Sequence, residues 1–176
     1  MSEVIAYTIS NYFVTTVVIG FICAGVSLMK KPKPLSKNII VEALFSYYLL
    51  WGIGISNILN FMFHVFFGDM AAQFSGWAQS PYQAEVGFAS LGIGIAGVLA
   101  YRAILPFRFA AILPPTVFGY GAAGGHIYQM ITADNFSAGN MGLVMPSGII
   151  IPTLAIIFVW LSYKHPMPDV SYTKLR

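Results

Sequence analysis

Three ionisable side chains within apolar sequence are the candidates for chemistry in this chain: His64, Glu85 and His126. Two imidazoles and a carboxylate are a suitable ligand set for copper, iron or zinc, with one position left open for chemistry. Two facing histidines could instead ligate a haem, and the same groups could hydrogen-bond a quinone or relay protons. Because such groups are costly to bury in a membrane, they indicate a functional site by default.

Polar residues at helical spacing accompany both histidines. Each set shares one helix face: Asn57, Asn60 and His64 in one case, and His126, Gln129 and Met130 in the other. We expect Asn60, Gln129 and Met130 to support the candidate ligands, and the thioether of Met130 suits copper(I). The alternative is that these groups only pair with one another as hydrogen bonds between helices, with no ligand. A further expectation is that Glu42 pairs with a lysine and carries no chemistry.

Long apolar helices must position these residues. The chain is 57% apolar and 9% charged, with mean hydropathy +0.74, which leaves too little polar surface for a water-soluble domain. About 20 apolar residues cross a hydrocarbon core of about 30 Å as a helix. The pattern predicts one all-α domain over residues 1–176, with five transmembrane helices at about 5–29, 39–67, 83–101, 109–131 and 142–163, and an interfacial segment at 68–82.

The cationic residues predict the orientation of these helices. All nine lysines and arginines fall on one side of the five-span pattern: Lys30, Lys31, Lys33, Lys37, Arg102, Arg108, Lys164, Lys174 and Arg176. Since cationic loops stay in the cytoplasm, the N-terminus is expected outside and the C-terminus in the cytoplasm. All three candidate residues then lie near the outer membrane face. The basic charge is explained by the loops and an anionic leaflet, so no nucleic-acid partner is indicated.

Small residues and prolines predict how the spans pack. In the third span, two stripes of mostly small residues lie on nearly opposite faces, which predicts a central helix with neighbours on both sides. The stripes are Gly87, Ser90, Gly94 and Gly97 on one face, and Glu85, Ala89, Gly92 and Ala96 on the other. Ser80 before Pro81 predicts an N-cap for that span. In the fourth span, Pro114-Pro115 and the glycines that follow predict a kink or local irregularity.

Two segments suggest a family. One is Trp77-Ala78-Gln79-Ser80-Pro81-Tyr82-Gln83-Ala84-Glu85-Val86-Gly87, and the other runs from Gly125-His126-Ile127-Tyr128-Gln129-Met130 to Asn135-Phe136-Ser137-Ala138-Gly139-Asn140. Together they resemble a group of small bacterial integral membrane proteins classed as a domain of unknown function, over roughly the latter two thirds of the chain. The resemblance implies a multi-pass protein of a bacterial cytoplasmic membrane and draws attention to Glu85 and His126. It implies no activity.

Three classes of function remain open on the sequence. The leading hypothesis is a binding or redox-accessory protein that holds a metal ion, haem or quinone-like ligand through His64, Glu85 and His126. The second is a small transporter or channel subunit, although the polar stripe fades inward from Asn57. The third is a structural subunit that binds a membrane protein partner or a second copy through its small-residue faces. No hydrolase or nucleotide-binding motif is present, the single Cys23 offers no disulfide or redox pair, and redox chemistry is not excluded.

Overall fold

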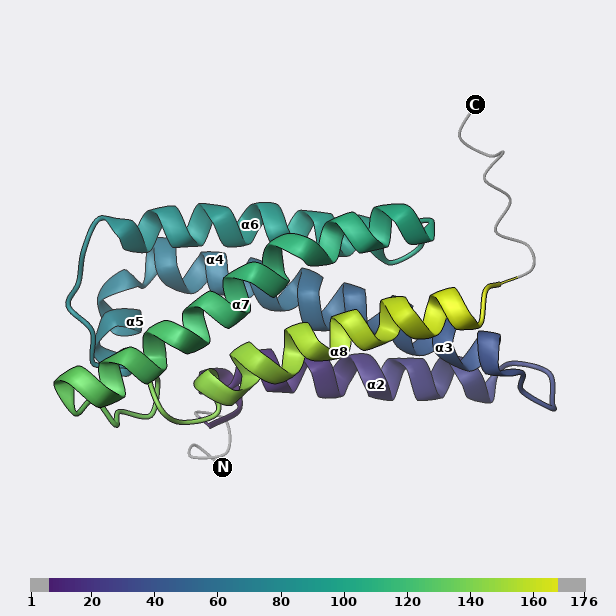
Figure 1. The fold of residues 1–176 in the computed structure, drawn as a ribbon, viewed down its shortest axis with the longest axis horizontal. Helices are drawn as coiled ribbons and strands as arrows, with labels where there is room; N and C mark the ends of the chain where they lie inside the picture. Colours follow the sequence, from purple (N-terminus) through teal and green to yellow (C-terminus); the bar gives the residue numbers. More distant parts are fainter. Residues whose placement is uncertain (1–6, 168–176) are drawn as a thin grey trace.

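The computed structural model describes residues 7–167, and this part of the chain is built from helices and contains no strand. The predicted all-α class is therefore confirmed for it. The helices in chain order are α2 (Tyr12–Met29), α3 (Lys37–Tyr47), the π-helix η1 (Tyr48–Ile55), α4 (Ser56–Phe66), α5 (Gly68–Ser75), α6 (Tyr82–Ala100), α7 (Leu105–Ala133) and α8 (Val144–Lys164). Figure 1 shows the long helices running back and forth along one axis of an elongated bundle.

Four of the five predicted spans form helices long and apolar enough to cross a membrane: α2, the continuous α3–η1–α4 helix, α6 and α8. The fourth predicted span, 109–131, lies within α7. This helix has 29 residues, but its prolines, glycines, His126 and Gln129 make it less apolar than the others. By length and composition, four helices within residues 7–167 are thus able to cross a membrane, which indicates a membrane protein.

Cationic residues gather at one end of the bundle. The connection between α2 and α3, the connection between α6 and α7, and the end of α8 all lie at this end, toward the right of Figure 1. We call it the cationic end. It carries the predicted topogenic residues that the structure describes: Lys30, Lys31, Lys33, Lys37, Arg102, Arg108 and Lys164. Lys174 and Arg176 lie outside the described residues.

Arg108 differs from the others because it is a buried residue of α7 and not a loop cation. It is 4% exposed, and its guanidinium group makes a bidentate ion pair with the Glu42 carboxylate at 2.7 Å for both contacts. It also donates to Ser46 and to the carbonyl oxygens of Ala100 and Tyr101. The expected partner of Glu42, a lysine, was therefore wrong. A planar guanidinium can satisfy five acceptors at once, which suits a buried position where a lysine ammonium would not.

The second span contains an irregularity that the sequence did not predict. Its middle, η1, is a π-helix of eight residues between the regular helices α3 and α4. Side chains support its loosened backbone, because Ser56 Oγ donates to the Gly52 carbonyl at 2.6 Å and Asn57 Nδ2 donates to the Ile53 carbonyl at 2.8 Å. In the fourth span, by contrast, α7 runs without interruption through Pro114 and Pro115. A local irregularity was therefore expected in the wrong helix, whereas the alternative, a kink at these prolines, stays a prediction.

One face of α6 packs closely against the second span, as its small residues predicted. Gly87, Ser90, Gly94 and Gly97 are all buried. A Cβ atom at Gly97 would lie 2.7 Å from the Gly54 backbone nitrogen of η1, so only glycine permits this approach. The opposite face of α6 is open, since Glu85 and Ala89 are exposed and a Cβ atom at Gly92 would meet no neighbour within 4 Å. The prediction of a central helix was therefore wrong, and α6 lies at the edge.

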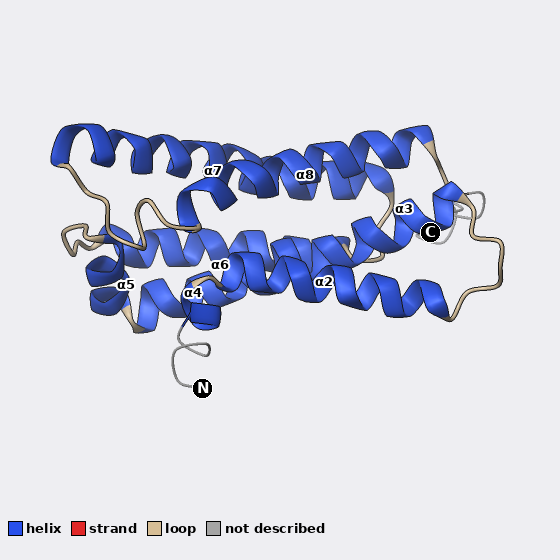
Figure 2. Ribbon diagram, turned by 90° about the horizontal axis from the view of Figure 1, so that it is seen from below, coloured by secondary structure: helices blue, strands red, loops and turns tan. Residues whose placement is uncertain are grey.

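The packed core occupies the half of the bundle toward the cationic end. Phe45, Tyr48, Ile112 and Phe158 meet there with at most 6% exposure, and the Tyr48 and Phe158 ring centroids are 5.2 Å apart. The Tyr48 hydroxyl also donates to the Ile151 carbonyl of α8 at 2.5 Å. Toward the other end the helices separate into two layers: α7 packs mainly on α8, and α4 packs mainly on α6. Figure 2 shows these layers diverging away from the cationic end.

Candidate ligand-binding cavity

A cavity of about 800 Å³ lies between the two layers, in the half of the bundle away from the cationic end. Helices α2, η1, α4 and α6 contribute to one wall, and α7 and α8 contribute to the other. Most lining side chains are apolar, and several are aromatic, such as Phe13, Phe63 and Phe118. The site therefore offers an apolar chamber with few polar groups, which is the usual character of a small-molecule site.

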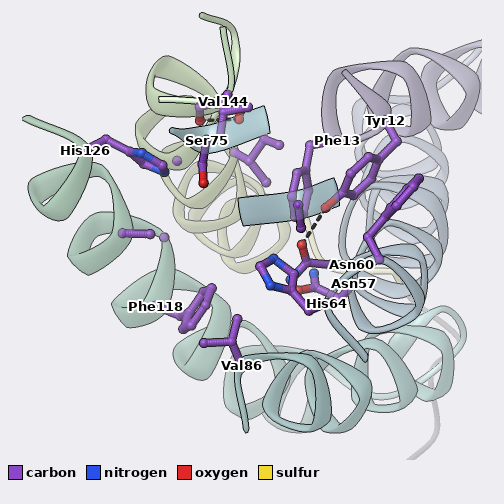
Figure 3. A pocket seen from close by; sticks show the side chains of 18 of the residues that line it. Tyr12, Phe13, Asn57, Asn60, His64, Ser75, Val86, Phe118, His126 and Val144 are labelled. Carbon is purple, nitrogen blue, oxygen red and sulfur yellow. Dashed lines mark hydrogen bonds between the residues drawn. The ribbon is translucent and has the colours of Figure 1, made fainter. Parts of the chain in front are cut away.

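His64 and His126 both line this cavity, and they reach it from opposite layers. Figure 3 shows His64 beside Asn57 and Asn60 on one wall, with His126 across the cavity on α7. The structure therefore brings the two predicted histidines to one chamber. Glu85 is exposed and does not line it. Within residues 7–167 there is no group of three or more His, Cys, Asp and Glu side chains placed to hold a metal ion.

The His64 imidazole is held by a neighbouring helix. Its Nδ1 atom is hydrogen-bonded to Oε1 of Gln83, in the first turn of α6. One helical turn away, Asn60 is 4% exposed and links two other helices, because its Oδ1 accepts from the Tyr12 hydroxyl and its Nδ2 donates to Ser90 Oγ at 2.7 Å. The α4 wall is thus fixed to α2 and α6 by hydrogen bonds that cross between helices.

His126 is held by Asn140, which lies in the connection between α7 and α8 and is fully buried. Asn140 Oδ1 lies 2.8 Å from His126 Nδ1 and 2.8 Å from Trp77 Nε1. Asn140 Nδ2 donates to the carbonyl oxygens of His126 and Asn135, at 3.1 and 2.8 Å. The Trp77 and His126 rings pack with centroids 5.3 Å apart. One amide therefore joins the segment after α5, the end of α7 and the loop before α8.

The other predicted supporting residues lie elsewhere. Gln129 and Met130 are half-buried on α7 and do not line the cavity. The predicted N-cap for α6 was also wrong, since Pro81 is the N-cap residue and no side-chain hydrogen bond caps the helix. The interfacial segment 68–82 contains α5 and is tied to the α7–α8 loop, where Ser137 Oγ donates to the Ser75 carbonyl at 2.6 Å.

Several polar atoms on the cavity walls have no hydrogen-bond partner within residues 7–167, and two of them lie on opposite walls. Thr116 Oγ1 on α7 is buried and unpaired. On the opposite wall Asn57 is 6% exposed, and only its amide nitrogen is used, so Oδ1 is left without a donor. Buried polar atoms are normally paired, because an unpaired one costs about 1–3 kcal/mol. Asn57 Oδ1 is not among the enclosed unpaired atoms, so it is the one of these two that a ligand or a water in the cavity would reach.

Three contributors to the site were not predicted as site residues, although all three lie in the two segments that suggested a family. Asn140 and Trp77 lie in connecting segments, where asparagine and tryptophan are ordinary residues of a membrane protein surface. Gln83 precedes the predicted ligand Glu85 by two residues, which places it on a different side of the helix. The useful signal was the predicted order of the spans, because it placed both His64 and the first turn of α6 near the same membrane face.

The fold and the cavity define a class: an all-helical protein with four helices apolar enough to cross a membrane and a partly open, mainly apolar chamber that two histidines line. The chain belongs to the family of unknown function DUF6790, which it matches over residues 10–168. The match covers nearly the whole chain and agrees with the expected membership in a family of unknown function. No curated protein and no solved structure matches this chain.

Proposed function

We propose that this protein crosses the cytoplasmic membrane of a bacterium five times, with its N-terminus outside and its C-terminus in the cytoplasm. Support comes from α7, which runs the length of the bundle between α6 and α8, so the cationic connections lie together at one end. A helix less apolar than its neighbours can cross a membrane when protein covers one side of it, and α7 packs along α8. The cationic end then faces the cytoplasm.

We further propose that the protein binds a lipid-soluble molecule with a polar ring and an apolar body, similar to a quinone. The observation that carries this proposal is the placement of His64 and His126 on opposite walls of one apolar chamber of about 800 Å³. This volume suits a ligand of small-molecule size, and a few polar groups within an apolar lining give such a ligand its orientation.

The lining also supports entry from the bilayer. Several apolar residues belong both to the cavity wall and to the exposed surface, including Ile9, Met70, Tyr82 and Leu143. These residues lie at the end of the bundle away from the cationic end, so a molecule at the membrane interface could reach the chamber past them. An apolar ligand favours such a route because apolar residues cover it along the way.

The competing functions have less support. A metal site would need ligands beyond the two histidines, and Glu85 lies outside the cavity. A transport path would have to pass the core formed by Phe45, Tyr48, Ile112 and Phe158, which are at most 6% exposed. A partner-binding role remains compatible with the open face of α6, but it leaves the cavity and its unpaired polar atoms without a purpose.

The test is to fill the cavity and ask whether a bound molecule is lost. Ala122 lines the cavity and Ala110 is exposed on the same helix, so Ala122→Phe and Ala110→Phe make a matched pair. We expect quinone-like molecules in solvent extracts of the wild-type protein and the Ala110→Phe variant, measured by mass spectrometry. Ala122→Phe should retain about tenfold less, since forcing a ring into an occupied site costs at least about 1.4 kcal/mol.

The same preparations separate this proposal from its alternatives. A visible absorption spectrum and a metal analysis of the wild type, with His64→Ala and His126→Ala, detect a haem or a metal ion. A haem band or stoichiometric metal that both substitutions abolish would replace the quinone-like ligand by that cofactor. Equal amounts of extracted molecule from Ala122→Phe and Ala110→Phe would place the ligand outside the cavity and overturn the proposal.

A further inference from the structure

The hydrogen bonds behind each histidine determine which proton its ring carries. Asn140 Nδ2 donates to two carbonyl oxygens, and the Trp77 indole nitrogen can only donate, so Asn140 Oδ1 must be an acceptor. His126 Nδ1, 2.8 Å from that oxygen, must therefore carry a proton. In the neutral imidazole the other nitrogen, Nε2, then holds a lone pair and accepts hydrogen bonds.

On the opposite wall the tautomer of His64 follows the Gln83 amide, which makes no second hydrogen bond within the described residues. With Gln83 Oε1 toward the ring, His64 Nδ1 is the donor and Nε2 of the neutral ring is an acceptor. Asn57 Oδ1, without a partner in the described part of the chain, is a third acceptor on the same helix. Acceptors therefore face the cavity from both layers.

Several donors on these walls are already used. The Trp77 indole nitrogen, the Tyr12 hydroxyl and the Asn57 amide nitrogen donate to protein oxygens. The hydroxyl groups of Ser10, Ser80 and Thr116, which also line the cavity, can either donate or accept. Gln83 keeps its amide nitrogen as a donor beside His64. Against this one donor, the lone pairs of His64, His126 and Asn57 favour a ligand that brings its own protons.

We propose that the cavity selects the hydroxyl-bearing, reduced form of a quinone-like molecule, a quinol, over the oxidised quinone. This inference rests on the proposed quinone-like ligand and adds the form that is bound. A quinol carries O–H donors on opposite sides of a flat ring, which fits acceptors on opposite walls among aromatic side chains. A quinone presents only carbonyl acceptors, so the lone pairs of the histidines would stay unpaired.

The experiment compares three molecules of one chain length: an isoprenyl hydroquinone, its dimethyl ether and the corresponding quinone. The wild-type protein, in lipid nanodiscs under anaerobic conditions, is titrated with each, and affinity is obtained from the rise in its unfolding temperature. We expect the hydroquinone to bind roughly tenfold or more tightly than either analogue, because each analogue leaves buried acceptors without donors. The quinone controls for size, since only the ether is larger than the hydroquinone.

Variants then assign the preference to the histidines. His64→Phe and His126→Phe should lower the ratio of hydroquinone to quinone affinity toward one. His165→Phe, the same substitution at the cationic end, should leave the ratio as in the wild type. A ratio retained in both cavity variants would show that the histidines do not select the hydroxyl groups.

The wild-type comparison alone can overturn the inference, even if a variant fails to fold. Equal affinities for the three molecules, or tighter binding of the quinone, would show that the cavity does not select donors, and the proposed function would stand without this refinement. Binding of none of the three would remove the quinone-like ligand itself, and with it the selection of a quinol. These results are distinguishable in one set of titrations.

Discussion

At the residue scale, Asn140 determines the geometry of the candidate site. It is fully buried, and its amide makes four hydrogen bonds to the segment after α5, the end of α7 and its own loop. An amide can do this because it presents donors and an acceptor in one plane. His126 was predicted as a site residue from the sequence, whereas Asn140, which orients its ring, was not.

Asn140→Leu should therefore destabilise the protein and disorder His126 together. The substitution keeps the side-chain size but leaves the Trp77 indole nitrogen and His126 Nδ1 without their acceptor. We expect a loss of about 2 kcal/mol or more, since each buried group left unpaired costs about 1–3 kcal/mol. The measurement is the apparent unfolding temperature in detergent. Asn38→Leu is the control, because the Asn38 side chain bonds only to the adjacent backbone, and an equal loss in both variants would contradict a special role for Asn140.

At the element scale, helical periodicity predicted the helices and one packing face, but not which helix is irregular. The stripe from Gly87 to Gly97 was read correctly because close backbone approach demands small residues wherever it occurs. Exposed small residues give the same pattern without any neighbour, which is why the stripe from Glu85 to Ala96 was misread. The π-helix η1 depends on hydrogen bonds from Ser56 and Asn57 to carbonyl oxygens. Spacing alone does not indicate these bonds.

The packed and open faces of α6 can be distinguished by placing the same leucine side chain on each. Gly97→Leu should lower the apparent unfolding temperature strongly, because its Cβ atom would lie 2.7 Å from the Gly54 backbone nitrogen. Overpacking of this kind costs about 1–3 kcal/mol, and more where backbone must move. Gly92→Leu adds the same side chain on the open face and should change stability little. If Gly92→Leu is equally destabilising, or abolishes a dimer seen by chromatography, the open face is covered in the native protein.

At the scale of the whole molecule, the distribution of charge predicted more of the fold than any motif did. The lysines and arginines identified one end of the bundle before its helices were placed, and the structure gathers the described ones there. Arg108 was the exception, because its position in the sequence predicted a loop cation. Its burial and its ion pair depend on α7 lying near α3, which carries Glu42, 66 residues away in the chain. The cavity was likewise unpredictable, since it arises from the divergence of two helix layers and not from any one segment.

The orientation of the bundle in the membrane gives the last prediction, and it depends on whether α7 crosses. In a Cys23→Ser background, a single cysteine replaces exposed Ser36 at the cationic end or exposed Ala138 in the α7–α8 loop. If all five long helices cross and cations stay inside, a membrane-impermeant maleimide added to intact cells should label Ala138→Cys and should label Ser36→Cys only after lysis. If α7 does not cross, Ala138→Cys lies on the same side as Ser36→Cys, and both are protected. In that case the two histidine-bearing layers could not enclose one cavity within the bilayer.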